Sequence, residues 1–189
     1  LKLTVAGVRA DAGIGLDGDG DRVVMVDHLG RVVDGDQLLY VLARARQATG
    51  ELQGPVVGTV MSNLGLELAL KGLGVAFLRA AVGDRHVLQM LRTHGGVLGG
   101  EASGHLLCLD KTTTGDGLIV ALQVLAVMKA TGKTLAELAA GMSRFPQQLI
   151  NVRVTKRFDA AREPSVASAI AEVEKSLGTR GRVVLRASG

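Results

Sequence analysis

Residues 55–82, with the sequence PVVGTVMSNLGLELALKGLGVAFLRAAV, decide the fold. We expect a strand over Pro55 to Val60, a helix over Gly65 to Lys71 that Gly72 closes, and a second strand over Val75 to Val82. A strand, a helix and a further strand in this order are typical of an α/β domain.

The same alternation continues downstream. The predicted elements are a helix over Asp84 to Arg92, a short strand at Val97 and Leu98, a strand over His105 to Leu109, and a long apolar helix over Asp116 to Lys129. Thr134 to Met142 then predicts a short helix, because Thr134-Leu135-Ala136-Glu137 matches a capping box. We therefore predict a layered α/β domain with a mixed or mostly parallel sheet.

Upstream, the apolar residues between Asp36 and about Gln47 recur at helical spacing, and Gly50 is a plausible stop. The β-branched run Val23 to Val26 predicts a strand that follows a loop rich in Asp and Gly.

Past the long helix, Phe145-Pro146-Gln147 breaks the pattern, and we place a domain boundary at Pro146. Beyond it we expect a strand from Leu149 to Val154, a helix from about Ser165 to Leu177, and a strand from Arg182 to Leu185. Since the chain begins at Leu1 without a Met, we expect an internal piece of a longer protein.

The composition excludes several classes of protein. With 47% hydrophobic and 21% charged residues in 189, the chain is not disordered. A net charge of +4 comes from scattered Lys and Arg with only 2% aromatics, which argues against nucleic-acid binding. The longest apolar stretch, Gly117 to Met128, is too short to cross a membrane. The single cysteine, Cys108, excludes an internal disulfide, and we expect a reducing, cytoplasmic location.

The most informative segment is Asp17-Gly18-Asp19-Gly20-Asp21-Arg22. Three carboxylates at alternate positions of a flexible loop can converge on one hard divalent cation, and an open coordination shell suits Mg²⁺. Arg22 could direct its guanidinium at a phosphoryl group bound there. A solvated turn is the alternative, but it would leave three like charges crowded without a counter-ion.

Two other motifs fail in this segment. An EF-hand loop would need Gly at its sixth position and Glu at its twelfth, where this chain has Arg22 and His28. Gly13 to Gly18 matches the dinucleotide fingerprint, yet that motif must open a helix, and here a further loop and a strand follow.

Three segments in order resemble the α-D-phosphohexomutases over essentially the whole chain. Asp17 to Arg22 is similar to the metal loop of that family, Gly100-Glu101-Ala102-Ser103-Gly104-His105 to its sugar-binding loop, and Arg186-Ala187-Ser188-Gly189 to the start of its phosphate-binding loop. Together with Asp110 to Gly117, the sugar-loop segment most resembles the glucosamine-phosphate branch.

This resemblance implies a division into three parts: residues 1–34 as the end of domain 2, residues 35–146 as a complete domain 3, and residues 147–189 as the start of domain 4. It implies Mg²⁺ held by Asp17, Asp19 and Asp21, with Arg22 in a supporting catalytic role. The substrate-binding residues that it implies are Glu101, Ser103, His105, Asp84, Arg85, Arg186, Ser188 and Gly189. Without the family, Glu101 could be a solvated loop charge, His105 a buried histidine, and Asp84 a helix cap.

The implied reaction interconverts glucosamine 6-phosphate and glucosamine 1-phosphate through a phosphoserine, with a hexose 1,6-bisphosphate as activator. The family's serine loop does not occur in this chain, so we expect the chain alone to be inactive. A sister mutase for mannose or glucose phosphates and a non-catalytic metal- or sugar-binding module remain alternatives. We expect a small sugar phosphate as partner, neither nucleic acid nor membrane, and leave a homodimer open.

Overall fold

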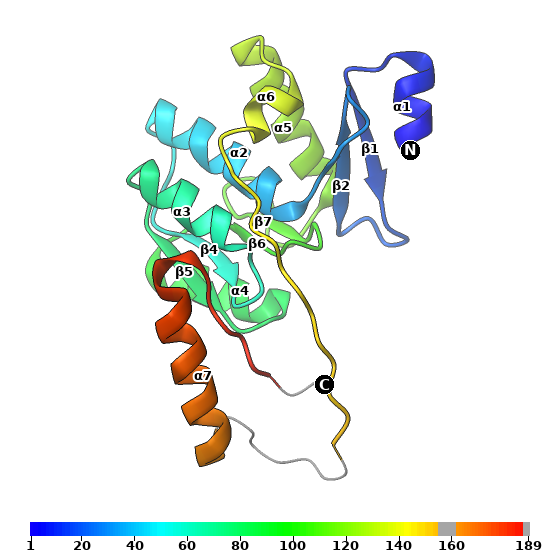
Figure 1. The fold of residues 1–189 in the computed structure, drawn as a ribbon. Coiled ribbons are helices and arrows are strands. Elements are labelled where there is room, and N and C mark those ends of the chain that lie inside the picture. Colours follow the sequence, from blue (N-terminus) through cyan, green and yellow to red (C-terminus); the bar gives the residue numbers. More distant parts are fainter. Residues whose placement is uncertain (155–161, 187–189) are drawn as a thin grey trace. The chain divides into compact units, whose positions relative to one another are not determined.

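The computed structural model describes residues 1–154 and 162–186, and the chain divides into two compact units, Leu1–Phe145 and Pro146–Gly189. The first unit contains a small and a larger sheet (Figure 1). The small sheet follows helix α1 (Lys2–Val8) and is antiparallel, in the order β1 (Ala12–Leu16), β2 (Val23–Asp27) and β3 (Val32–Val33).

The larger sheet has the order β5-β4-β6-β7. Its strands are β4 (Val56–Thr59), β5 (Phe77–Ala80), β6 (Leu98–Gly100) and β7 (Leu106–Cys108). The central strand β4 pairs in parallel with β5 and β6, whereas β7 runs antiparallel to β6. The predicted α/β fold with a mixed sheet is therefore confirmed.

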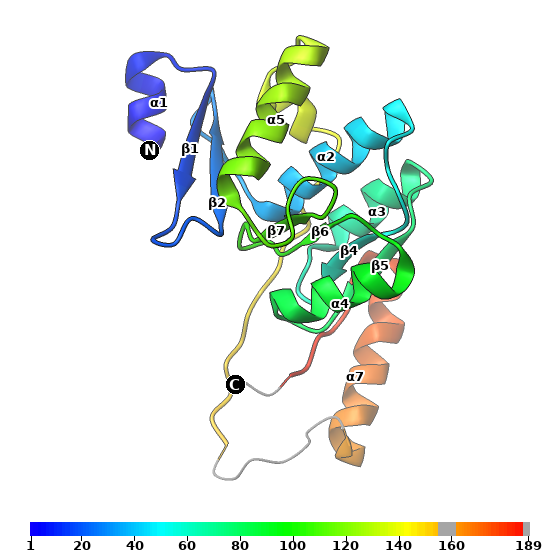
Figure 2. The same ribbon diagram turned by 180° about the vertical axis from the view of Figure 1, so that it is seen from behind.

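Helices cover both faces of this sheet because successive strand residues point to opposite sides. Val56 of β4 belongs to the main core, and Val57 packs instead with Val87 and Leu91 of helix α4 (Asp84–His94). The main core is shared by α2 (Gly35–Thr49), α3 (Leu64–Gly72), α5 (Gly117–Thr131) and α6 (Leu135–Ala139). Helix α5 also lies alongside β2, as both views show (Figures 1 and 2), and so joins the two sheets.

Helix α2 begins and ends at recognisable caps. The Asp34 side chain accepts a hydrogen bond from the Gln37 N–H in a capping box, and Gly50 closes the helix in the left-handed conformation. Tyr40, on the buried face of α2, places its hydroxyl against Gly141 in the turn after α6.

The last residues of the first unit are tied to the starts of two helices. The Asn63 side chain, which caps α3, donates to the Phe145 carbonyl over 2.9 Å and accepts from the Phe145 N–H over 3.0 Å. Arg144 forms an ion pair of 3.2 Å with Asp34 at the start of α2. The backbone is thus held in place directly before Pro146.

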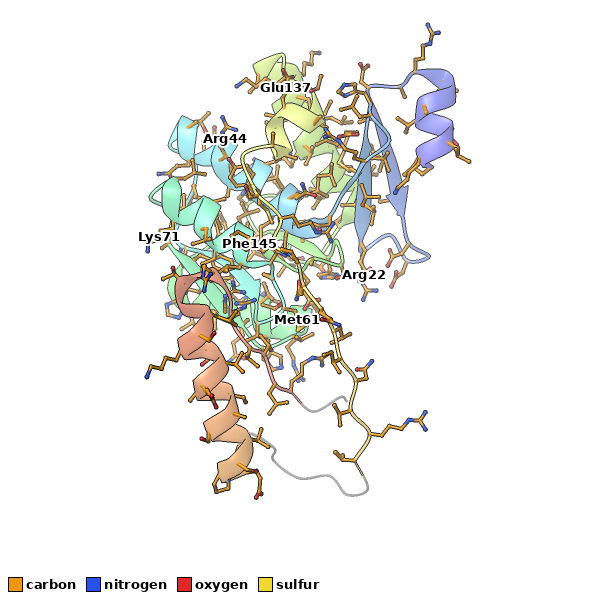
Figure 3. The ribbon with its side chains drawn as sticks, in the orientation of Figure 1. Arg22, Arg44, Met61, Lys71, Glu137 and Phe145 are labelled. Atoms are coloured by element: carbon orange, nitrogen blue, oxygen red, sulfur yellow. The ribbon has the colours of Figure 1, made fainter. Side chains whose placement is uncertain are left out.

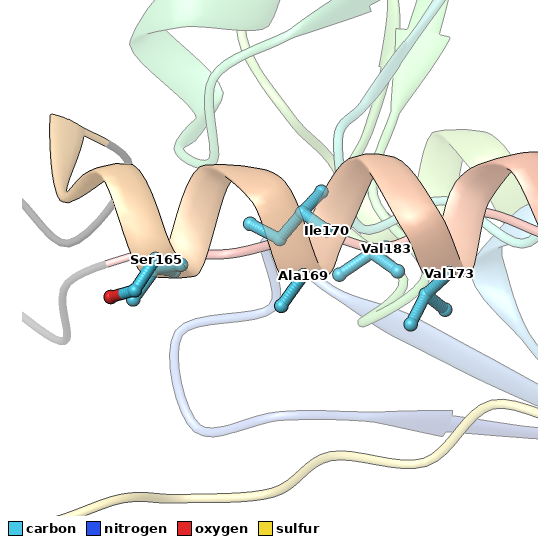
Figure 4. A pocket seen from close by; sticks show the side chains of 6 residues that line it. Ser165, Ala169, Ile170, Val173 and Val183 are labelled. Carbon is cyan, nitrogen blue, oxygen red and sulfur yellow. The ribbon is translucent and has the colours of Figure 1, made fainter.

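In the second unit, the described residues form helix α7 (Pro164–Leu177) and a short 3₁₀ turn (Gly178–Arg180). The expected helix is confirmed, but the strands expected over Leu149 to Val154 and Arg182 to Leu185 were wrong, since neither segment forms a ladder in the described part of this unit. A strand needs a partner, and a β-branched composition alone does not supply one. One face of α7 and Val183 line an open apolar groove (Figure 4).

Among the described residues, no helix has the length and apolar character needed to cross a membrane.

Candidate functional site

The three carboxylates of the Asp17–Arg22 loop converge. This loop connects β1 to β2 as a hairpin, in which Leu16 pairs with Val23. One ligand oxygen from each of Asp17, Asp19 and Asp21 lies within 4.8 Å of the others. The loop folds back on itself because the Arg22 N–H donates to Asp17 Oδ1 over 3.2 Å. Figure 3 shows the Arg22 side chain at the end of this loop.

The electrostatics of the loop favour the ionised form of the Asp17 carboxylate. Desolvation, the largest single influence, acts to raise the pKa of Asp17, but the Arg22 N–H, the Asp21 side chain and the Arg22 charge together lower it. The Arg22 guanidinium lies 3.9 Å from both Asp17 Oδ2 and Asp21 Oδ1.

The donor set fits a hard divalent cation. Oxygen-only ligands are those that Mg²⁺ and Ca²⁺ prefer. Asp21 Oδ1 is shielded from solvent and accepts no hydrogen bond, so this oxygen lacks the hydrogen-bonded partner that a buried carboxylate oxygen normally has. A cation held by the loop would supply that partner.

The Glu101–His105 loop lies at the carboxyl end of β6 and contacts a neighbouring loop. Glu101 Oε1 accepts a hydrogen bond of 2.9 Å from the Gly83 N–H. Gly83 directly precedes α4, whose first residues are Asp84 and Arg85. The structure thus brings Glu101 next to the segment that carries these two exposed residues, while Ser103 is exposed in the turn of its own loop.

The carboxylate loop and the Glu101 loop touch directly. His105 Nδ1 lies 3.0 Å from Asp21 Oδ2, and the Val23 N–H donates to the Gly104 carbonyl over 3.1 Å. Nearby, the Gly117 N–H donates to the Gly20 carbonyl over 2.9 Å. Segments far apart in the sequence therefore meet at one junction.

Comparisons with known proteins identify the family of this chain. A sequence model described as phosphoglucomutase/phosphomannomutase, alpha/beta/alpha domain III, matches residues 34–145. This chain belongs to that family. The model of the family's C-terminal domain matches residues 149–189.

Curated relatives match this chain over its whole length. The chain is 60% identical to phosphoglucosamine mutase of Methylococcus capsulatus and 61% identical to that of Alkalilimnicola ehrlichii, in both cases over all of this chain and 42% of the relative. It therefore spans less than half the length of these curated relatives.

Among solved structures, a phosphoglucomutase/phosphomannomutase family protein from Burkholderia thailandensis has a TM-score of 0.66 at 25% identity, covering 75% of this chain and 31% of that one. Aspergillus fumigatus N-acetylphosphoglucosamine mutase, solved with GlcNAc-6P and magnesium, has a TM-score of 0.76 at 23% identity, covering 95% and 46%. This second likeness supports the fold.

Three further residues that we predicted to bind substrate belong to the second unit. Arg186 is exposed and belongs to the second unit, and Ser188 and Gly189 lie outside the described residues. His105 is only 5% exposed, so the structure offers no support for a direct substrate contact through its ring.

Some contacts at the site were not anticipated from the sequence. Neither the approach of His105 to Asp21 nor that of Gly83 to Glu101 leaves a local pattern, because each joins distant segments. Asn63 could have been found, since Asn directly before an apolar helical run is a common cap. Asp116, the first residue of the expected long helix, caps α5, since its side chain accepts a hydrogen bond from the Ile119 N–H.

Proposed function

We propose that the protein of which this chain is part is a phosphoglucosamine mutase, which interconverts glucosamine 6-phosphate and glucosamine 1-phosphate. The observation that carries this proposal is the full-chain identity of 54% to 61% with bacterial proteins of that name. The contact between the carboxylate loop and the Glu101 loop supports it, because a phosphoryl-transfer enzyme must hold metal and sugar at a fixed separation.

We assign the metal to Asp17, Asp19 and Asp21, with Mg²⁺ as the ion. Bound there, Mg²⁺ would supply Lewis-acid stabilisation of charge on the phosphoryl group. Arg22, whose side chain is 53% exposed, carries a cation that can also face that group.

We assign recognition of the sugar to Glu101 and Ser103, with Asp84 and Arg85 at the adjoining start of α4. The Gly83 N–H orients the Glu101 carboxylate by binding Oε1, which leaves Oε2 to accept a hydrogen bond from a sugar hydroxyl. We place Arg186, Ser188 and Gly189 in a phosphate-binding loop and expect a hexose 1,6-bisphosphate activator.

For the domains, we propose that residues 1–34 end domain 2, residues 35–146 form domain 3, and residues 147–189 begin domain 4. The separation of the two units after Phe145 supports the second of these limits. We expect no turnover from the 189-residue chain alone, because the phosphoserine that the family uses is expected outside it.

Substituting Glu101 in the full-length protein tests the function. Glu101→Gln keeps the size of the side chain but removes its charge, so kcat/KM for glucosamine 6-phosphate should fall about tenfold or more, a loss of roughly 1.4 kcal/mol or greater. The dependence on magnesium concentration should not change, because the carboxylate loop is intact. Glu51→Gln, at an exposed residue after α2, is the matched control and should retain full activity.

Comparison of three sugar phosphates decides between the mutases. The wild-type protein should prefer glucosamine 6-phosphate over glucose and mannose 6-phosphates. Equal or better kcat/KM for mannose 6-phosphate would instead identify a sister mutase.

Calorimetry on the chain itself tests the metal site. We expect weak Mg²⁺ binding, since three carboxylates from one loop leave several coordination positions to water. Asp19→Asn should weaken that binding at least tenfold, because one of the three anionic ligands is lost. An unchanged Mg²⁺ affinity would exclude the loop as the metal site.

A further inference from the structure

We propose that His105 is a positioning residue for the cation: its Nδ1–H holds the Asp21 carboxylate in orientation and so fixes the metal loop against the sugar loop. This inference rests on the proposed assignment of the metal to the Asp17–Arg22 loop. It gives His105 a role distinct from the direct substrate contact expected from the sequence.

The hydrogen bond itself determines the tautomer of His105. Asp21 Oδ2, 3.0 Å from Nδ1, is a carboxylate oxygen and can only accept when ionised. The ring must therefore carry its proton on Nδ1. Nε2 is buried without a hydrogen-bond partner, and an unpaired lone pair there costs less than a buried, unpaired N–H. We therefore assign the proton to Nδ1 from this hydrogen-bond geometry.

The contact divides the two oxygens of Asp21 between two tasks. His105 occupies Oδ2, whereas Oδ1 accepts no hydrogen bond and lies 3.9 Å from the Arg22 guanidinium. Oδ1 is thereby left for a cation. A hydrogen bond to the second oxygen of a ligating carboxylate is the usual way in which proteins orient such a ligand.

Close backbone packing restricts the movement of the His105 ring. A Cβ at Gly115 would clash with His105 Nε2, so this glycine allows the chain after β7 to press against the ring. On the other side of the junction, a Cβ at Gly104 would clash with the Val23 carbonyl. The Gly115 backbone thus packs against the imidazole, and Asp21 is the hydrogen-bond partner of the ring.

The burial of the ring separates this role from direct catalysis. His105 is 5% exposed, its Nδ1 is bound to Asp21 and its Nε2 is buried, so the ring is poorly placed to exchange a proton with a substrate. Whatever His105 contributes, it contributes through Asp21.

Two substitutions in the 189-residue chain test the proposal by calorimetry with Mn²⁺ and with Mg²⁺. In His105→Asn the amide N–H takes the place of Nδ1–H, and affinity should stay within about threefold of the wild-type value. In His105→Gln the amide lies where Nε2 was and cannot bind Asp21, so affinity should fall by about tenfold or more. Thermal unfolding of both variants checks that they are folded.

The affinities of these variants either support or overturn the proposed role of His105. Equal affinities of wild type and folded His105→Gln overturn the proposal. If His105→Gln does not fold, His105→Asn decides: a loss above tenfold in that variant overturns it. The Asp19→Asn variant distinguishes failure of the metal assignment from failure of the role of His105. If Asp19→Asn does not weaken metal binding, the assignment of the metal to this loop is wrong. If Asp19→Asn weakens binding and His105→Gln does not, only the proposed role of His105 is wrong.

The tautomer offers a readout independent of metal. In chain labelled with ¹⁵N-histidine, which contains four histidines, the ring of His105 should show the Nδ1–H pattern, and His105→Asn identifies its signals by their disappearance. An Nε2–H pattern would overturn the proposal.

Discussion

Asp36, one position inside α2, is a carboxylic acid that the fold buries almost completely, with 1% exposed. Its Oδ2 accepts a hydrogen bond of 2.7 Å from the Asn63 N–H, whereas Oδ1 is buried without a hydrogen-bond partner. Burial raises the pKa of Asp36 from 3.8 to about 6, and the Asn63 N–H only partly opposes this shift.

The raised pKa predicts how stability changes with pH. Because the folded pKa lies above the unfolded value, the stabilisation is complete below about pH 4 and is lost as the pH rises through 6. The free energy of unfolding of the wild type minus that of Asp36→Asn should fall by on the order of 3 kcal/mol between pH 4 and pH 7. Urea unfolding at several pH values measures this difference.

Asp11→Asn is the control for Asp36, because Asp11 is exposed. Its stability difference from the wild type should stay nearly constant over the same pH range. A difference for Asp36→Asn that is independent of pH would contradict the prediction.

For individual residues, the sequence predicted the chemical groups of the site better than it predicted which residues contact one another. The alternation of Asp17, Asp19 and Asp21 indicated a convergent set of oxygens, since a short loop must bring them together, and their oxygens do lie close. The partner of Asp21 is 84 residues away, and no local pattern encodes such a pair. For the same reason the buried state of Asp36 was not anticipated.

Between elements, an ion pair joins the end of α2 to the turn after β7. Arg46, 7% exposed, donates from Nη1 to Asp110 Oδ1 over 2.9 Å, and its Nη2 is buried without a hydrogen-bond partner. Asp110 also lies 3.4 Å from the exposed Lys111 ammonium. The guanidinium therefore depends on Asp110 for charge compensation.

Removing the carboxylate should destabilise the protein more than the surface position of Asp110 suggests. Asp110→Asn should lower the free energy of unfolding by about 2 kcal/mol, since it leaves a buried cation unpaired. Adding Arg46→Met should recover part of the loss, because the unpaired charge is gone. Urea denaturation of the single and double variants measures both effects.

Lys111→Ala provides the comparison, with an expected change below about 1 kcal/mol for an exposed partner. A double variant no more stable than Asp110→Asn would show that the buried charge is not the cause.

Element prediction succeeded where local signals and tertiary packing agree. The capping box at Thr134 is present, and the Thr134 N–H and hydroxyl hydrogen bonds lower the pKa of Glu137. The helix predicted over Asp84 to Arg92 is α4. The strands expected over Leu149 to Val154 and Arg182 to Leu185 failed because a ladder depends on a second strand, which composition cannot reveal. The short strand β3 has only two residues and gave too weak a pattern.

In the molecule as a whole, Asn63 holds the chain directly before the boundary between the two units. Its amide forms paired hydrogen bonds with the Phe145 backbone, 82 residues away. Asn63→Ala removes both bonds and should release residues 144 and 145 locally, a loss of about 1 kcal/mol or more. Cleavage by trypsin after Arg144 should then accelerate about fivefold or more.

The same digest contains its own control. Arg92 lies in α4, away from Asn63 in the sequence and in a helix whose contacts the substitution does not touch. Its cleavage rate should remain that of the wild type. An equal acceleration at both sites would indicate global destabilisation and contradict a local role for Asn63.

The placement of Tyr40 against Gly141 has an optical consequence. Tyr40 is the only tyrosine, and the chain has no tryptophan, so tyrosine fluorescence originates from a single fluorophore in the first unit. Residues 146–189 contribute no such emission. Fluorescence melting curves therefore report the first unit alone, whereas far-ultraviolet circular dichroism also detects α7. Two transitions that fail to coincide would reveal that the units melt independently.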